Sequence, residues 1–348
     1  INPASYSSID SLTFVFDVGM SLQVTNFKEG NVKKNAKNAD FEYAVGGFRL
    51  MPKVGLAFGI IPFTNIGYNY QSTGTVNRDD ISGTTTYTNT YSGEGGLHEA
   101  FVGLGWQPVK GVSLGVNGGY LWGNCTRTVS NAYSDSYVNT LSKTMSFDVT
   151  NYKVNFGVQL SRNLSPKDLL TLGATYSIGH KLNADPTLDI VSTNSQTSVT
   201  DTIQFVANNG IELPHEFALG LAYTHNNSFT VAFDYQMQQW SKVHYPKYND
   251  TGNGKPIFYS ASGMFSDRQK FNLGMEYCRD KAGRNFASRV CYRLGASYTT
   301  PYLKINGLEG PKEFSVSGGF GLPILNQWNN RSILNISAQW VRSSAKDM

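Results

Sequence analysis

Two cysteines in the C-terminal third of the chain are placed so that they could react with each other. In FNLGMEYCRDKAGRNFASRVCYRLGASY, residues 271–298, Cys278 and Cys291 flank a polar segment that can turn back on itself. If the flanks pair as an antiparallel hairpin with Cys278 opposite Cys291, Glu276 falls opposite Arg293. The pattern predicts a Glu276–Arg293 ion pair beside two adjacent thiols. An oxidising compartment would allow a disulfide, but directly opposed strand positions often hold their Cβ atoms too far apart for one, so bonded and free thiols both stay open.

The same pairing sorts the rest of the hairpin onto two faces. Apolar or aromatic residues face one way and small residues share the other face with the ion pair, as Tyr277/Tyr292, Met275/Leu294 and Gly274/Gly295. A slip of one residue would break every match. The ion pair and the two thiols are therefore carried by strands with one apolar and one polar face.

Other reactive groups do not form a site. The five histidines show no metal-ligand spacing, and no serine nucleophile is accompanied by an oriented base. Cys125 is expected to be an unpaired thiol in a loop or at a strand end. Asp17, Glu99 and Asp234 share the polar faces of predicted strands, where they line an interior. We expect neither an enzyme nor a bound metal or cofactor.

The two-faced pattern recurs along the whole chain. In SLTFVFDVGMSLQV, residues 11–24, every second residue from Leu12 to Leu22 is large and apolar. This alternation predicts a strand that is polar on one side, in either a soluble sandwich or an outer-membrane barrel. Thirteen such strands are predicted, at 11–25, 40–50, 53–69, 97–107, 111–123, 149–162, 168–180, 214–225, 228–240, 269–279, 288–298, 312–323 and 332–342.

The connections favour the barrel. Short turns alternate with long polar loops, predicted at 26–39, 70–96, 124–148, 181–213, 241–268 and 299–312, and this is the pattern of outer-membrane barrels. Because such barrels have an even number of strands, we expect fourteen, with a closing strand beyond Met348. The fold class is thus an all-β, antiparallel, up-and-down transmembrane barrel.

Composition limits the alternatives. Charged residues are only 16% of the chain, and no Lys/Arg cluster resembles a nucleic-acid patch, so no nucleic-acid partner is expected. The chain contains no run of about 18 apolar residues, so no transmembrane helix is predicted. The chain begins without a signal peptide at Ile1, as expected of a mature or trimmed chain.

The N-terminus carries a more specific signal. Asn2, Pro3 and Ala4 precede the first long strand, and ELPHEFALGLAY (212–223) and FDYQMQQWSKV (233–243) follow later. In this order the chain resembles the long-chain fatty acid transporter (FadL) family of outer-membrane barrels. The resemblance implies fourteen strands and an N-terminal plug, with residues 1–10 as the end of the plug and 11–348 as the barrel. It also implies that Asn2, Pro3 and Ala4 lie in the ligand-contacting plug region.

Pro62 interrupts a predicted spanning strand. Proline gives no N–H to a ladder, so it implies a local gap or kink. Ile61 and Phe63 beside it are apolar on the interior phase. We expect either a lateral exit for a hydrophobic ligand, with Ile61, Pro62 and Phe63 as contacts, or a bulge whose apolar residues pack on the plug. The resemblance implies the same kink in the third strand.

Two functions follow. The first is passive uptake of hydrophobic small molecules such as long-chain fatty acids across the outer membrane of a Gram-negative bacterium, with lateral release at the kink. The second is a non-transporting barrel of the same family, an accessory or anchoring subunit of an outer-membrane secretion or assembly complex. The polar loops, such as GTTTYTNTYSGEGG (83–96), weigh against a fatty-acid-capturing surface. Expected partners are outer-membrane lipid and lipopolysaccharide, a hydrophobic ligand, and other outer-membrane proteins or lipoproteins.

Overall fold

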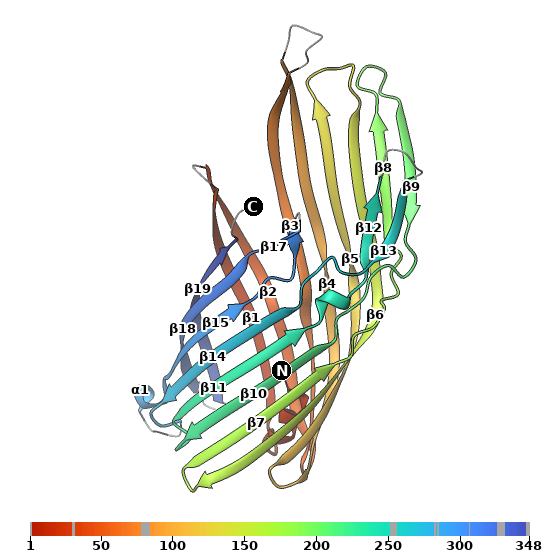
Figure 1. The fold of residues 1–348 in the computed structure, drawn as a ribbon. Helices are drawn as coiled ribbons and strands as arrows, with labels where there is room; N and C mark the ends of the chain where they lie inside the picture. The colour runs from red at the N-terminus through yellow and green to blue at the C-terminus, as the bar shows by residue number, and fades with distance from the viewer. Residues whose placement is uncertain are drawn as a thin grey trace.

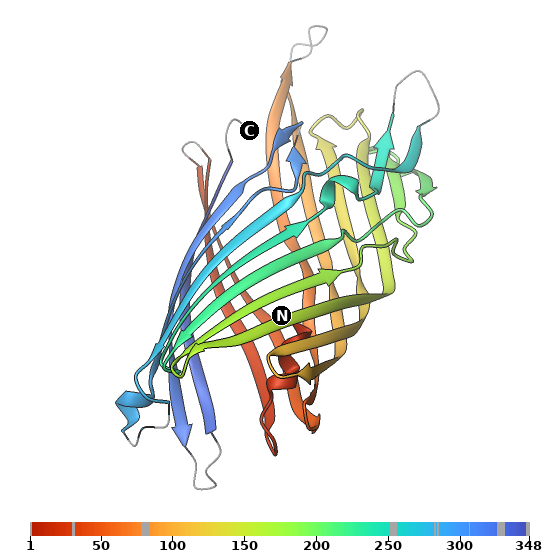
Figure 2. The same ribbon diagram turned by 60° about the horizontal axis from the view of Figure 1, so that its bottom comes forward.

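The chain forms one long antiparallel sheet that curves into a barrel wall (Figures 1 and 2). The computed structural model describes residues 2–29, 32–77, 84–250, 256–281, 283, 285–305, 307–325 and 331–345. Within these residues, thirteen strands follow one another along the main path of the sheet. They are β1 (Phe14–Glu29), β2 (Val32–Met51), β3 (Val54–Asn77), β4 (Thr84–Val109), β5 (Val112–Tyr133), β6 (Thr140–Ser165), β7 (Asp168–Ser177), β10 (Glu216–His225), β11 (Phe229–Gln238), β14 (Arg268–Cys278), β15 (Cys291–Thr299), β18 (Lys312–Leu325) and β19 (Arg331–Ser344).

Each strand on this path corresponds to one of the thirteen predicted from alternation, and the predicted all-β antiparallel fold is confirmed. Smaller elements fill the connections: β8 (Thr187–Thr193) and β9 (Thr200–Val206) extend the sheet from β6, and two separate hairpins are β12 (Tyr245–Asn249) with β13 (Ile257–Ala261) and β16 (Lys304–Ile305) with β17 (Leu308–Glu309). The helical segments are η1 (Pro3–Ser8), η2 (Trp240–Lys242) and α1 (Phe286–Arg289). None of the described helices is long and apolar enough to cross a membrane.

The prediction of long loops was wrong for the first three. Residues 26–39, 70–96 and 124–148 largely continue the strands on either side, so β3–β6 rise far above the rest of the wall (Figure 1). Residues 70–96 and 124–148 are rich in Thr and Tyr, which favour strands, but they lack an apolar face. Alternation of hydrophobicity finds only the part of a strand that meets an apolar environment.

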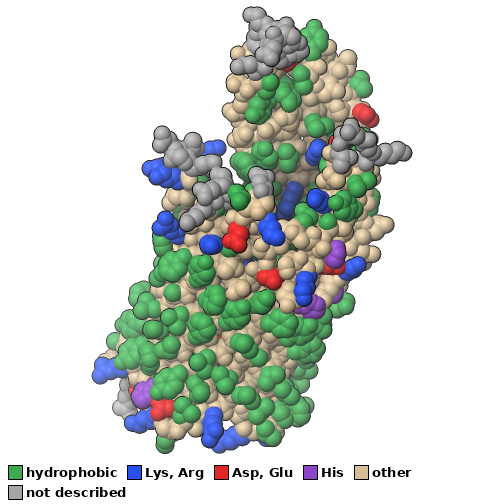
Figure 3. Space-filling view, in the orientation of Figure 1, with side chains coloured by type: hydrophobic (Ala, Val, Ile, Leu, Met, Phe, Trp, Pro, Cys, Tyr) green, Lys and Arg blue, Asp and Glu red, His purple; other side chains and the backbone are tan. Residues whose placement is uncertain are grey.

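The outer surface of the lower wall is apolar. Alternate residues of each strand there are large, hydrophobic and exposed, for example Val102, Leu104 and Trp106 on β4 and Leu219 and Leu221 on β10. Figure 3 shows hydrophobic side chains gathered over the lower part of the molecule, with more polar surface above them. Such a band is the signature of a barrel wall in contact with lipid.

Candidate functional site

The interior of the barrel wall holds the N-terminal segment. η1 packs against β2–β6, and its N-cap residue Asn2 anchors it: the side-chain amide donates to the carbonyl of Val158 at 2.9 Å, and its oxygen accepts from the backbone N–H of Ala4 at 3.0 Å. Pro3 and Ala4 are fully buried. The resemblance assigned both to ligand contact, but in the structure they have no surface to offer a ligand. They fix the plug to the wall, while Asn2 also borders the interior cavity.

Glycines in the wall make room for this helix. A Cβ added to Gly115 would lie 2.3 Å from the backbone nitrogen of Ala4, and one added to Gly157 would lie 2.1 Å from Asn2 Oδ1. The plug and the wall are therefore complementary at backbone level, because any side chain at these positions would push the helix away.

A buried ion pair lies above the plug. Lys153 Nζ is 3.0 Å from Glu99 Oε2, with side chains only 16% and 5% exposed, and the same ammonium sits 4.8 Å from the ring centroid of Phe63. Gly119 lies between them, paired with Phe101 on one side and with Lys153 on the other. Because it has no side chain, it leaves the space in which Glu99 and Lys153 meet. The sequence placed Glu99 on a polar strand face, but its pairing with Lys153 was not predicted, because the pair depends on the register of three strands.

A second group of residues, the upper layer, packs on the inner face of the wall above the plug. Two connections, residues 178–186 and 207–215, place Leu182, Ala184, Ile211 and Leu213 against the inner face of β4–β6, where they meet Leu97, Leu121, Cys125 and Val149. Cys125 is a free, fully enclosed thiol inside β5, so the expectation of a loop or strand-end thiol was wrong. These connections lack the alternation of a strand, so their inward fold was not predicted.

A cavity beside the plug is lined in part by charged and amide side chains. The cavity, about 510 Å³ in volume, is bordered by Asn2, Glu99, Lys153, Asn155, Glu216 and Asp234, among others. Glu216 is further held by the side-chain amides of Gln236 and Gln238, at 2.7 and 2.8 Å. Charged and amide side chains share this cavity with apolar ones such as Ile61 and Phe101, so a hydrocarbon chain in it would lie directly beside buried polar groups.

The predicted kink is present at Pro62. The register between β3 and β4 shifts between Pro62 and Thr64, and pairing of β3 with β2 ends at Ile60, opposite Ala44. Beyond this point a side-chain bond from Asn65 Nδ2 to Asp40 Oδ1, 3.1 Å, links the two strands. Beyond Ile60, β2 and β3 are therefore no longer paired as neighbouring strands of the sheet.

The residues beside Pro62 do not form one patch. Ile61 packs with Tyr6, Ala57 and Phe101 on the plug side, whereas Phe63 packs against the upper layer. Ile61 therefore fits the bulge alternative, in which both residues pack on the plug, whereas Phe63 packs on the upper layer instead.

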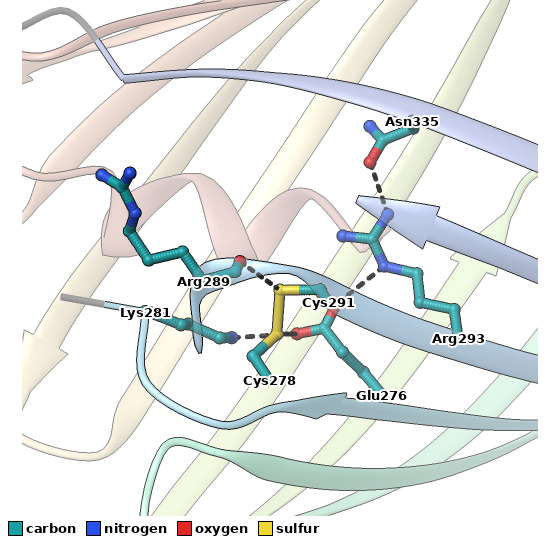
Figure 4. Close-up of a disulfide and its surroundings, with 7 residues drawn as sticks. All are labelled: Glu276, Cys278, Lys281, Arg289, Cys291, Arg293 and Asn335. Atoms are coloured by element: carbon teal, nitrogen blue, oxygen red, sulfur yellow. Dashed lines mark hydrogen bonds and ion pairs between the residues drawn. A yellow bond between two sulfur atoms is a disulfide. The ribbon is translucent and has the colours of Figure 1, made fainter. Parts of the chain in front are cut away.

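The hairpin of β14 and β15 has the predicted register, with Cys278 opposite Cys291 and Glu276 opposite Arg293. The two cysteines form a disulfide, with Cα atoms 4.3 Å apart. Figure 4 shows the Glu276 carboxylate between Lys281 Nζ, at 2.9 Å, and Arg293 Nε, at 2.8 Å. Arg293 also donates to Asn335 Oδ1 on β19 at 2.6 Å.

This arrangement is structural and not catalytic. Among the described residues, Glu276, Cys278 and Cys291 form a cluster with metal-ligand spacing, but both sulfurs are used in the disulfide. The bond closes residues 279–290, which carry α1, at the end of the barrel where the other described connections are short turns. The network therefore braces the base of a loop.

Solved structures with this fold are outer-membrane channels. The monoaromatic hydrocarbon channel CymD is 13% identical, with a TM-score of 0.62, over 99% of this chain and 87% of that one. The toluene transporter TodX of Pseudomonas putida is 14% identical (TM-score 0.55; 97% and 86% covered), and a FadL homologue of Pseudomonas aeruginosa is 11% identical (0.55; 98% and 84%). At these identities the likeness shows the fold alone.

Sequence comparison decides the family. Residues 1–347 match the family model described as BamG. The chain belongs to the BamG family. A comparison with curated protein sequences finds no match. The FadL-type fold and the BamG family together place the protein in the bacterial outer membrane.

Proposed function

We propose that this BamG-family barrel does not transport a ligand and serves as an accessory subunit of the BAM outer-membrane assembly complex. The family match over residues 1–347 points to that complex. The resemblance to FadL-type channels supplies the membrane-embedded body, and the function lies in association with other outer-membrane proteins or lipoproteins.

The observation that carries this proposal is the state of the interior. η1 packs on the inner face of β2–β6, the layer around Leu121 and Leu182 packs on β4–β6 above it, and the cavity beside η1 is bordered by the Glu99–Lys153 ion pair. Burial of a hydrocarbon chain is favourable by about 25 cal/mol per Å² of apolar surface removed from water, and only where the surroundings are apolar. A fatty acid in this cavity would have to lie beside the Glu99–Lys153 ion pair and the other charged and amide groups that line it.

Hydrophobic uptake is the second candidate, and the break at Pro62 favours it. A ladder that ends at Ile60 could release a ligand sideways, with Ile61, Pro62, Phe63 and Asn2 as contacts. In the accessory role the same break shapes the wall and seats Ile61 on the plug.

A tagged chain purified from native outer membranes in mild detergent separates the two roles. The proposal predicts that subunits of the assembly complex co-purify in fixed stoichiometry, and that lipid extracts contain no more long-chain fatty acid than extracts of an unrelated tagged barrel. Enrichment of fatty acid with no stoichiometric partner would overturn the accessory role and favour uptake.

A further inference from the structure

The outward face of the β1–β2 hairpin changes character sharply along its length. On β1, Phe14, Phe16, Val18, Met20, Leu22 and Val24 occupy alternate positions, and all are between 46% and 88% exposed. The next residues on that face are Asn26 and Lys28. An apolar strip therefore leads directly into a polar, basic segment.

The register of the hairpin adds two more lysines to this face. Lys37 lies opposite Val24, and Lys33 lies opposite Lys28. Directly paired residues of an antiparallel ladder share a face, so Lys28, Lys33 and Lys37 point the same way as the apolar strip. All three are exposed. We call these three residues the lysine face.

The height of the lysine face matches the polar edge of a bilayer. From Phe14 to Val24 the strand rises about 33 Å at about 3.3 Å per residue. At a strand tilt of about 40° this covers about 25 Å of the membrane normal, the height of the apolar band of such barrels. Lys37 then lies at the upper border of the hydrocarbon, and Lys28 and Lys33 lie about 10 Å above it.

Acidic side chains on the described part of the hairpin are turned elsewhere. Asp40 pairs with Ser21 on the opposite face and accepts from Asn38 and Asn65, and Glu42 accepts a hydrogen bond from Ser21 Oγ. None of the three lysines forms an ion pair with a described residue. The lysine face thus presents positive charge that the described part of the chain does not neutralise.

We propose that the lysine face binds the phosphate groups of an anionic outer-leaflet lipid whose acyl chains lie along the apolar strip below. Lys ammonium groups bind phosphate as point charges, and Lys37 can extend its aliphatic stem along the strip while its charge reaches the headgroups. The continuity of strip and lysines favours a lipid over an acidic protein, which would have no use for the strip. This site does not depend on the proposed role in assembly.

The test is a titration of the purified, folded chain in detergent with diphosphoryl lipid A, followed by native mass spectrometry. The variant is Lys28→Gln/Lys33→Gln/Lys37→Gln. The matched control is Lys34→Gln/Lys53→Gln/Lys110→Gln, which removes the same charge from the opposite face of the hairpin and from turns at the other end of the wall. Heat-modifiable migration on gels verifies that both fold.

Each nearby lysine contributes about fivefold to binding of an anionic lipid, so the lysine-face variant should bind lipid A on the order of a hundredfold more weakly. The control variant should bind lipid A like the unaltered chain. Dephosphorylated lipid A should bind weakly to all three proteins. Equal lipid A binding by all three proteins would overturn the proposal. So would displacement of lipid A by millimolar inorganic phosphate, which would mark a free-phosphate site, or a lysine-face variant that keeps the lipid but loses a protein partner.

Discussion

Loss of the Cys278–Cys291 disulfide should weaken the barrel by an amount set by the loop that it closes. The two cysteines are 13 residues apart, and cross-linking a loop of this length removes chain entropy from the unfolded state worth about 3 kcal/mol. In the Cys278→Ser/Cys291→Ser variant, the β14–β15 ladder and the Glu276–Arg293 pair stay in place. The free energy of unfolding should therefore fall by about 3 kcal/mol without a change of fold.

Urea unfolding in lipid or detergent, followed by tryptophan fluorescence, measures this difference. A reducing agent should lower the stability of the unaltered chain to that of the double variant and leave the double variant unchanged. Cys125→Ala is the control, because it removes a free thiol and keeps the disulfide, so a reducing agent should lower its stability by as much as that of the unaltered chain. Equal stability of the oxidised chain and the double variant would show that the bond does not constrain the unfolded chain, and the reasoning would fail.

Three further predictions concern the interior. Gly115→Val should displace the plug and make it accessible to protease, because the new Cβ would overlap η1. Gly118→Val on the same strand has open space around it and should leave the plug protected. Equal protease sensitivity of the two variants would contradict the close fit of η1 to the wall glycines. Glu99→Gln should cost about 2 kcal/mol in urea unfolding, less than the 3–5 kcal/mol of a dry pair because Lys153 borders the cavity, and no loss would mean that the pair is solvated. Pro62→Ala should leave uptake of a labelled fatty acid unchanged in cells, and a clear fall in uptake would support a transport role.

The sequence was sufficient for the membrane-facing part of the fold. Wherever a strand meets lipid on one side and an interior on the other, the environment imposes strict alternation, and the thirteen strands follow from it. The β14–β15 hairpin was predictable to the residue because opposed cysteines, opposed charges and opposed glycines admit only one register.

The interior and the upper wall could not be derived in this way. Above the apolar band both faces of β3–β6 meet polar surroundings, so the strands continue without alternation. The inward fold of residues 178–186 and 207–215 and the Glu99–Lys153 pair depend on contacts between distant segments. The ion pair places charge inside the barrel wall, which weighs against uptake of a hydrocarbon chain.

The central claim is that this barrel works as a subunit of an assembly complex, and its native mass tests that most directly. The tagged chain, released from outer membranes in mild detergent and weighed by native mass spectrometry, should appear in one assembly with subunits of the BAM complex in fixed ratio. A chain that appears only by itself, with bound fatty acid, would contradict the account.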